Sequence, residues 1–157
     1  MGEYIILRDI SDSDLPLIMA WRSNPLIYQG FYTQKSPLVW HEHLSWWKSR
    51  PSSWKQFIIT LIQDTHVRDI GVVSIGQMEY WEAEIGIYIG EVTLWGKGYG
   101  KQAVKLALDY LREHGFKYTR TTILDNNERS QRLFQSLGYK RIGEARIGES
   151  LYRKELK

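Results

Sequence analysis

The chain has 157 residues, of which 43% are hydrophobic and 25% charged, and this composition predicts one globular domain over residues 1–157. It contains no cysteine, which excludes disulfides, thiolate metal sites and cysteine nucleophiles and suits a cytoplasmic location. No stretch has the length of a membrane span, and Met1–Asp9 lacks the pattern of a signal peptide, so we expect no membrane association.

The formal net charge of +3 suits an anionic ligand such as CoA or a nucleotide. The basic residues are dispersed along the chain, and dispersed charge gives little support for a nucleic-acid partner, so we expect none. Tryptophan is frequent, with seven residues in total. Five of them lie in the first third of the chain: Trp21, Trp40, Trp46, Trp47 and Trp54.

Residue patterns in the first half predict a strand, two helices and three further strands. The first strand covers residues 4–8, and Ser11 or Asp12 caps a helix that runs to about residue 22. Asn24-Pro25 ends this helix, an aromatic loop follows, and Ser36-Pro37 begins a second helix that runs to about residue 48. Three segments have the apolar pattern of strands: 56–62, 70–75 and 83–89.

The second half alternates helices and strands. Apolar residues at helical spacing from Ala103 to Leu111 predict a helix that ends at Gly115, and a strand follows at 120–124. Asn127 caps a helix that runs to Leu137, and two strands close the chain at 139–146 and 149–156. The order βααβββαβαββ predicts an α/β (α+β) fold with a mixed central sheet of about seven strands and about four flanking helices.

A glycine-rich segment, LWGKGYGK at residues 94–101, lies directly before the third predicted helix. Its alternating glycines expose backbone N–H groups, and the positive end of the helix dipole faces the same place. Gln102 after Lys101 excludes the P-loop pattern, and the third glycine comes one residue early for the dinucleotide fingerprint. The segment therefore predicts a site for a phosphorylated small molecule, with a turn that binds nothing as the alternative.

A second motif, NERSQRLFQSLGY at residues 127–139, would form a capped helix whatever its function. Together with WGKGYG at 95–100, however, it resembles the two coenzyme motifs of the GNAT superfamily of acetyl-CoA-dependent N-acetyltransferases. The form Trp-Gly-Lys-Gly-Tyr is similar to the branch with the ribosomal-protein N-terminal acetyltransferases. The resemblance covers nearly the whole chain and implies the GNAT fold and acetyl-CoA as cosubstrate.

The resemblance assigns coenzyme binding to residues 83–139. Trp95 departs from the Gln or Arg that begins the family's loop, so main-chain amides and Lys97 would bind the diphosphate there. The implied coenzyme-binding residues are Ile87, Tyr88, Ile89, Trp95, Gly96, Lys97, Gly98, Tyr99, Gly100, Lys101, Asn127, Ser130 and Phe134.

Acetyl transfer to an alkyl ammonium needs a proton acceptor, because such an amine has a pKa of about 10.4. The resemblance places a carboxylate on the strand at 83–89, where Glu84 is our candidate; a surface glutamate without a catalytic role is the alternative. Backbone N–H groups near Ile87–Ile89 would polarise the carbonyl. Phe134 stands where many members have the tyrosine acid, so Ser130, Tyr139, Tyr88, water or no dedicated group would protonate the thiolate.

Residues 1–55 would then bind the acceptor. The segments Trp21-Arg22-Ser23-Asn24-Pro25 and Trp40-His41-Glu42-His43-Leu44 resemble acetyltransferases that modify nucleotide-linked amino sugars, in which Arg22 and His43 would contact the nucleotide. A purely structural role for the tryptophans is the alternative. His41 and His43 are two residues apart on a predicted helix and face different ways, so no metal site is expected. The predicted acceptor-binding residues are Trp21, Arg22, Asn24, Tyr28, His43 and Trp47.

These patterns predict an N-acetyltransferase that transfers an acetyl group from acetyl-CoA to a primary amine of a small molecule. A nucleotide-linked amino sugar is the specific acceptor we expect. A protein or ribosomal-protein N-terminal acetyltransferase and a non-catalytic acyl-CoA-binding module are the alternatives. A homodimer and a monomer both remain open.

Overall fold

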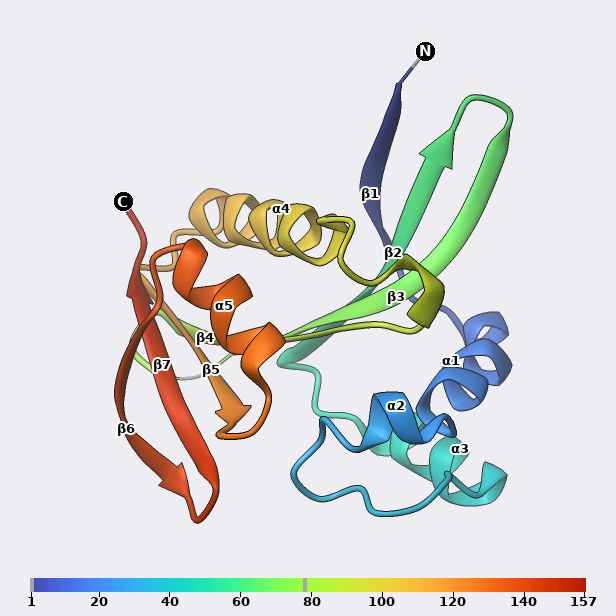
Figure 1. The fold of residues 1–157 in the computed structure, drawn as a ribbon, viewed down its shortest axis with the longest axis horizontal. Helices are drawn as coiled ribbons and strands as arrows, with labels where there is room; N and C mark the ends of the chain where they lie inside the picture. The colour runs from blue at the N-terminus through green and yellow to red at the C-terminus, as the bar shows by residue number, and fades with distance from the viewer. Residues whose placement is uncertain (1, 78) are drawn as a thin grey trace.

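A computed structural model, which describes residues 2–77 and 79–157, contains a seven-stranded sheet with the order β1-β2-β3-β4-β5-β7-β6 (Figure 1). Only β4 and β5 are parallel; the other neighbours in the described chain are antiparallel. The predicted mixed α/β fold is confirmed. The strands are β1 (Glu3–Asp9), β2 (Trp54–Gln63), β3 (His66–Gln77), β4 (Glu82–Ile89), β5 (Tyr118–Leu124), β6 (Lys140–Arg146) and β7 (Glu149–Glu155).

The helices flank this sheet on both faces (Figure 1). Four α-helices in the described chain have eight residues or more, as predicted, and α2 has four. No helix of the described residues is both long and apolar enough to cross a bilayer. The helical elements are η1 (Asp12–Asp14), α1 (Leu15–Arg22), α2 (Pro25–Tyr28), α3 (Trp40–Ser49), η2 (Val92–Leu94), α4 (Tyr99–Glu113) and α5 (Glu128–Ser136).

Two helix boundaries differ from the prediction. Asn24 ends α1 as expected, but its side chain accepts a hydrogen bond from the Leu26 amide and caps α2, which was predicted as a loop. Helix α3 begins at Trp40 rather than at Ser36-Pro37. The Ser36 carbonyl instead accepts a hydrogen bond from the Gln34 side chain, which also donates to the Arg22 carbonyl and holds this segment as a loop.

Strand β3 begins at His66, although the sequence predicted this strand only from residue 70. Its Asp69 carboxylate accepts hydrogen bonds from Thr60 and Arg8, which satisfies the polar side chain within the sheet. The register between β2 and β3 shifts at Ile59/Thr60. Partners on β1 and β2 therefore allow polar residues within β3, and for this reason local composition predicted a strand that is too short.

The sheet has a different helix layer on each face. Helix α4 covers one face with the apolar positions predicted for it, all buried: Ala103, Val104, Ala107, Leu108 and Leu111. On the other face, Ile18 and Trp21 of α1 pack against Ile58 and Val72. Alternating residues of β2 and β3 therefore serve two separate cores. Strand β4 also contributes to both, with Ala83 and Ile85 in one core and Tyr88 packed against the other.

Strands β4 and β5 pair at only three positions, from Glu82–Tyr118 to Glu84–Arg120. Beyond Glu84, β4 continues beside β3 to Ile89, and β5 continues beside β7 to Leu124. The two parallel strands therefore diverge after Glu84 and leave a gap in the middle of the sheet.

Candidate active site

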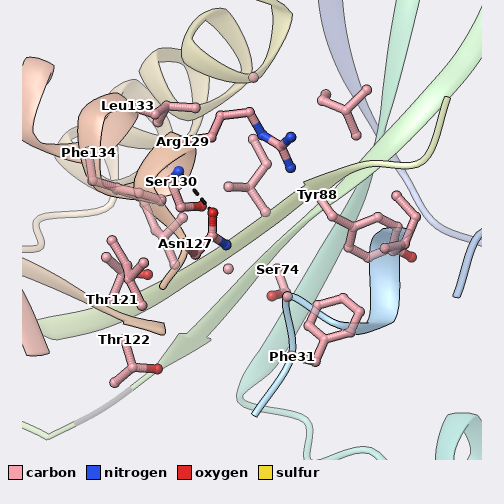
Figure 2. Close-up of a pocket in the computed structure, with 18 of the residues that line it drawn as sticks. Phe31, Ser74, Tyr88, Thr121, Thr122, Asn127, Arg129, Ser130, Leu133 and Phe134 are labelled. Carbon is pink, nitrogen blue, oxygen red and sulfur yellow. Dashed lines mark hydrogen bonds between the residues drawn. The ribbon is translucent and has the colours of Figure 1, made fainter. Parts of the chain in front are cut away.

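A cavity of about 760 Å³ lies at the divergence of β4 and β5. Its walls come from β4, β5, the glycine-rich loop, α5 and the segment around α2 (Figure 2). Glu84 and Arg22 line it together with most of the predicted coenzyme residues. These are Ile87, Tyr88, Ile89, Trp95, Gly96, Gly98, Tyr99, Gly100, Lys101, Asn127, Ser130 and Phe134.

The glycine-rich loop has a backbone that only glycine adopts easily. Gly96 has φ +80° and Gly98, the N-cap of α4, has φ +84°. A Cβ at either position would meet no atom within 4 Å, so both glycines face open space. The first amides of α4 have no partner within the helix and carry its positive dipole end, which suits an anion in this part of the cavity.

The side chains of Lys97 and Tyr99 do not share one environment: the first is exposed to solvent, and the second forms a hydrogen bond to β1. Lys97 is exposed and does not line the cavity. Hydrogen bonds from Gln63 and Tyr99 lower the pKa of Glu3, and the charge of Lys97 adds to this effect. The Tyr99 hydroxyl donates to Glu3 at 2.8 Å and so ties the start of α4 to β1. The expectation that Lys97 contacts the diphosphate has no support from this geometry.

The edge of β4 that faces the gap offers main-chain groups at Ile87, whereas the Ile89 carbonyl on the same edge already accepts from Trp95 Nε1. Gly90 N–H donates to Ile70 C=O, and Ile89 lies opposite Gly71, so Ile89 is in a non-hydrogen-bonded pair with β3. Because such pairs alternate, Ile87 also directs its N–H and C=O toward β5, where β5 has moved away. The Ile87 amide is therefore available to a ligand in the gap.

Glu84 lies at the last paired position before the strands diverge. Its Oε1 is 3.8 Å from Arg120 Nε, and its side chain retains 27% exposure. Burial raises the pKa of Glu84 above that of an ordinary glutamate, and Arg120 opposes this shift. Glu84 is thus a half-buried carboxylate in the cavity lining, at the point where β4 and β5 begin to diverge, and burial shifts its pKa in the direction that suits a general base.

The candidate acids are separated by the fold. Tyr139 is buried, shares a hydrogen bond of 2.9 Å with Thr119 and packs edge-on against Phe134, so its hydroxyl lies in the core and not in the cavity. Ser130 lines the cavity near the start of α5, where its amide donates to Asn127 Oδ1 (Figure 2). Tyr139 is therefore not placed to protonate a thiolate, whereas Ser130 faces the cavity.

Of the six residues predicted to bind the acceptor, Arg22 lines the cavity. Arg22 donates through Nε and Nη2 to Gln34 Oε1 and lies 5.0 Å from the ring centre of Phe31. Within the described chain, no carboxylate pairs with Arg22, and burial lowers its pKa. Arg22 therefore brings an uncompensated positive charge to the cavity.

The other predicted acceptor residues do not line this cavity. Trp21 is buried and donates to Glu91; His43 is buried with Nε2 near the Leu15 carbonyl; Trp47 donates to Asp12. Asn24 caps α2, and Tyr28 ends it. These side chains pack or form hydrogen bonds within and around α1–α3, and a structural role of this kind was the alternative given for the tryptophans.

Several cavity residues were missed at the sequence level. Phe31 and Tyr32 follow α2, and Arg146 stacks on Tyr32 at 3.7 Å while donating to the buried Glu149. Thr121, Thr122, Arg129 and Arg132 come from β5 and α5. Only Arg129 and Arg132 had a local signal, because they lie within the second motif; Arg146 reaches the cavity from a distant hairpin.

The described residues contain no group of three or more His, Asp or Glu side chains that could hold a metal ion. His43 is buried against Trp46, with ring centres 5.5 Å apart and nearly parallel planes. The burial of His43 lowers its pKa and favours the neutral ring. This histidine therefore has a packing role in α3.

Comparison with known proteins finds similarity to a protein and to a domain structure from one organism. An uncharacterized protein of Methanocaldococcus jannaschii is 49% identical over 148 residues, which is 94% of this chain but only 30% of that protein. The chain thus spans less than a third of that relative. A domain structure from the same organism is 47% identical with a TM-score of 0.95, covering 99% of this chain and 100% of that one.

More distant structures share the fold. Spermidine N-acetyltransferase from Vibrio cholerae, solved with CoA and spermine, is 18% identical with a TM-score of 0.80, covering 97% of this chain and 95% of that one. The family model described as Acetyltransferase (GNAT) domain matches residues 5–140, which is most of the sequence. The chain therefore belongs to the GNAT acetyltransferase domain family.

Proposed function

We propose that this domain transfers an acetyl group from acetyl-CoA to a primary amine of a small molecule. The observation that carries the proposal is one cavity that joins three features: the open amides of the glycine-rich loop, the unpaired edge of β4 and the half-buried Glu84. Groups suited to bind a phosphate, an open strand edge suited to an extended pantetheine arm, and a base therefore line the same cavity.

Each group has a task that its position suits. Bound acetyl-CoA would supply a thioester in the gap, and the Ile87 amide would donate to its carbonyl oxygen. Glu84 accepts one proton from the acceptor ammonium, which frees the nitrogen lone pair to form the C–N bond. As the C–S bond breaks, the second nitrogen proton passes to the sulfur, with the Ser130 hydroxyl or water as carrier. No covalent enzyme intermediate is required.

The charge of the cavity favours an anionic acceptor over a polycation. Of the five cationic side chains in its lining, three come from the two coenzyme motifs: Lys101, Arg129 and Arg132. Arg22 and Arg146 are left for the acceptor side, and the lining carboxylates are Glu84 and Glu149. Glu149 is already bound by Arg146. Arg22 lies beside Phe31, a combination suited to phosphate and a flat ring. We therefore propose a nucleotide-linked amino sugar as the acceptor.

The test is thiol release from acetyl-CoA with a panel of amines. We expect release with a nucleotide-linked 4-amino sugar and little with spermidine or with peptide N-termini. Peptide-dependent release would instead favour the protein N-terminal acetyltransferase. Tight CoA binding without thiol release for any amine would favour the non-catalytic module. That alternative is considered because Phe134 lacks the hydroxyl of the family's tyrosine.

Arg22→Ala tests the acceptor side. Removing this cation from the cavity should raise the KM for the acceptor about 10-fold or more and leave the KM for acetyl-CoA near its original value, because charged hydrogen bonds contribute about 1.5–3 kcal/mol. Arg50→Ala is the matched control, since Arg50 also stacks on an aromatic ring, Trp47 at 3.3 Å, but does not line the cavity. Equal changes in both KM values for Arg22→Ala would contradict the assignment.

A further inference from the structure

Trp95 occupies the loop position where the family's pattern has a side chain able to bind phosphate. Its indole Nε1 donates to the Ile89 carbonyl at 2.9 Å, which fixes the ring against the end of β4. The guanidinium of Arg129, from the first turn of α5, lies 3.5 Å from the centre of that ring. Trp95 is therefore a fixed platform for an arginine contributed by a different element.

Arg129 is free to bind an anion. Among residues 2–77 and 79–157, no carboxylate pairs with it, and its neighbour Arg132 adds like charge. Partial burial lowers the pKa of Arg129, although much of the side chain stays exposed. Figure 2 shows its guanidinium extending from α5 over the cavity, whose lining also includes Gly96 and Gly98.

The other cations near the loop lack one or more of these features. Lys101 lines the cavity, but no aromatic ring of the described residues lies beneath its ammonium group as Trp95 does beneath Arg129. Arg132 on the same helix is exposed and lies 3.7 Å from Glu128. Lys97 is exposed and outside the cavity lining. Arg129 alone among these four combines an aromatic platform, a place in the cavity lining and no acidic partner in the described chain.

We infer that Arg129, held flat on Trp95, binds the diphosphate of the coenzyme and replaces the side chain that the loop lacks at position 95. A planar guanidinium can donate two parallel hydrogen bonds to phosphate oxygens while its face stays on the indole. Trp95 is then a positioning residue that acts through Arg129. This inference rests on acetyl-CoA being the cosubstrate.

The test measures binding of CoA and of dephospho-CoA, which keeps the diphosphate but lacks the 3′-phosphate, by calorimetry. Arg129→Ala should weaken both ligands by a similar factor of about 10. Arg129→Lys should recover part of the lost affinity, because lysine keeps the positive charge but not the planar guanidinium that donates two parallel hydrogen bonds. Trp95→Leu should also weaken both, and the double variant should lose less than the product of the single losses.

Arg112→Ala is the control for net charge, since Arg112 is exposed, pairs with Asp109 on α4 and does not line the cavity. It should leave both affinities unchanged. Thermal unfolding of each variant separates lost binding from lost folding. Unchanged affinity in folded Arg129→Ala, or a loss confined to CoA, would overturn the role at the diphosphate. Failure of the unaltered protein to bind either ligand would overturn the proposed function itself.

Discussion

Glu84→Gln should lower kcat by about 10² to 10⁴, the usual contribution of a positioned general base, while the affinity for CoA stays the same. Glutamine keeps the size of the side chain in the cavity lining but cannot accept the ammonium proton. Steady-state kinetics together with CoA calorimetry measure the two effects separately. Unchanged turnover would remove Glu84 as the base.

The pH profile provides a second test of Glu84. The base must be ionised to act, so activity should fall as pH decreases through its pKa. Because burial raises the pKa of Glu84, this decrease should lie above the pH at which an ordinary glutamate, with a pKa of about 4.3, titrates. The residual activity of Glu84→Gln should not show this decrease at low pH. Glu79→Gln is the control, because Glu79 is exposed and outside the cavity lining, and it should keep the original profile.

Gly98→Ala should weaken CoA binding about 10-fold or more. A side chain at φ +84° is strained by about 1 kcal/mol, and relaxing that strain would turn the loop amides away from a bound phosphate. The new methyl group would also stand in the open space beside those amides. Calorimetry with CoA measures the loss.

Gly115→Ala is a closely matched control for this variant. Gly115 has φ +81° and an equally open Cβ position, but it follows the other end of α4 and does not line the cavity. Both variants should lower the unfolding temperature by similar amounts, and only Gly98→Ala should affect CoA. Equal CoA affinity in the two folded variants would contradict a phosphate site at the loop.

The coenzyme half of the molecule was predictable because its signals are local in sequence. Alternating glycines before an amphipathic helix specify positive φ and exposed amides without distant partners, and Gly96 and Gly98 have that geometry. Asn127 caps α5 as its motif requires. Glu84 keeps 27% of its side chain exposed between the buried Ala83 and Ile85, as expected for alternating residues of a strand.

The acceptor half was less predictable because its residues are brought together by tertiary contacts. Aromatic and basic residues near Trp21 and His43 looked like a ligand pocket, but buried indole and imidazole groups also need hydrogen-bond partners, and Glu91 and Leu15 supply them. Arg146 reaches Tyr32 from the last hairpin, more than a hundred positions away. No spacing rule connects residues at that separation.

The most direct measurement is a crystal structure of the protein with CoA bound. We expect the diphosphate oxygens within hydrogen-bond distance, about 2.7–3.2 Å, of main-chain amides between residues 96 and 100. The pantetheine arm should lie between β4 and β5, with its sulfur on the Glu84 side of the gap. A coenzyme bound elsewhere, with these amides unoccupied, would contradict the assignment of the site and the activity proposed from it.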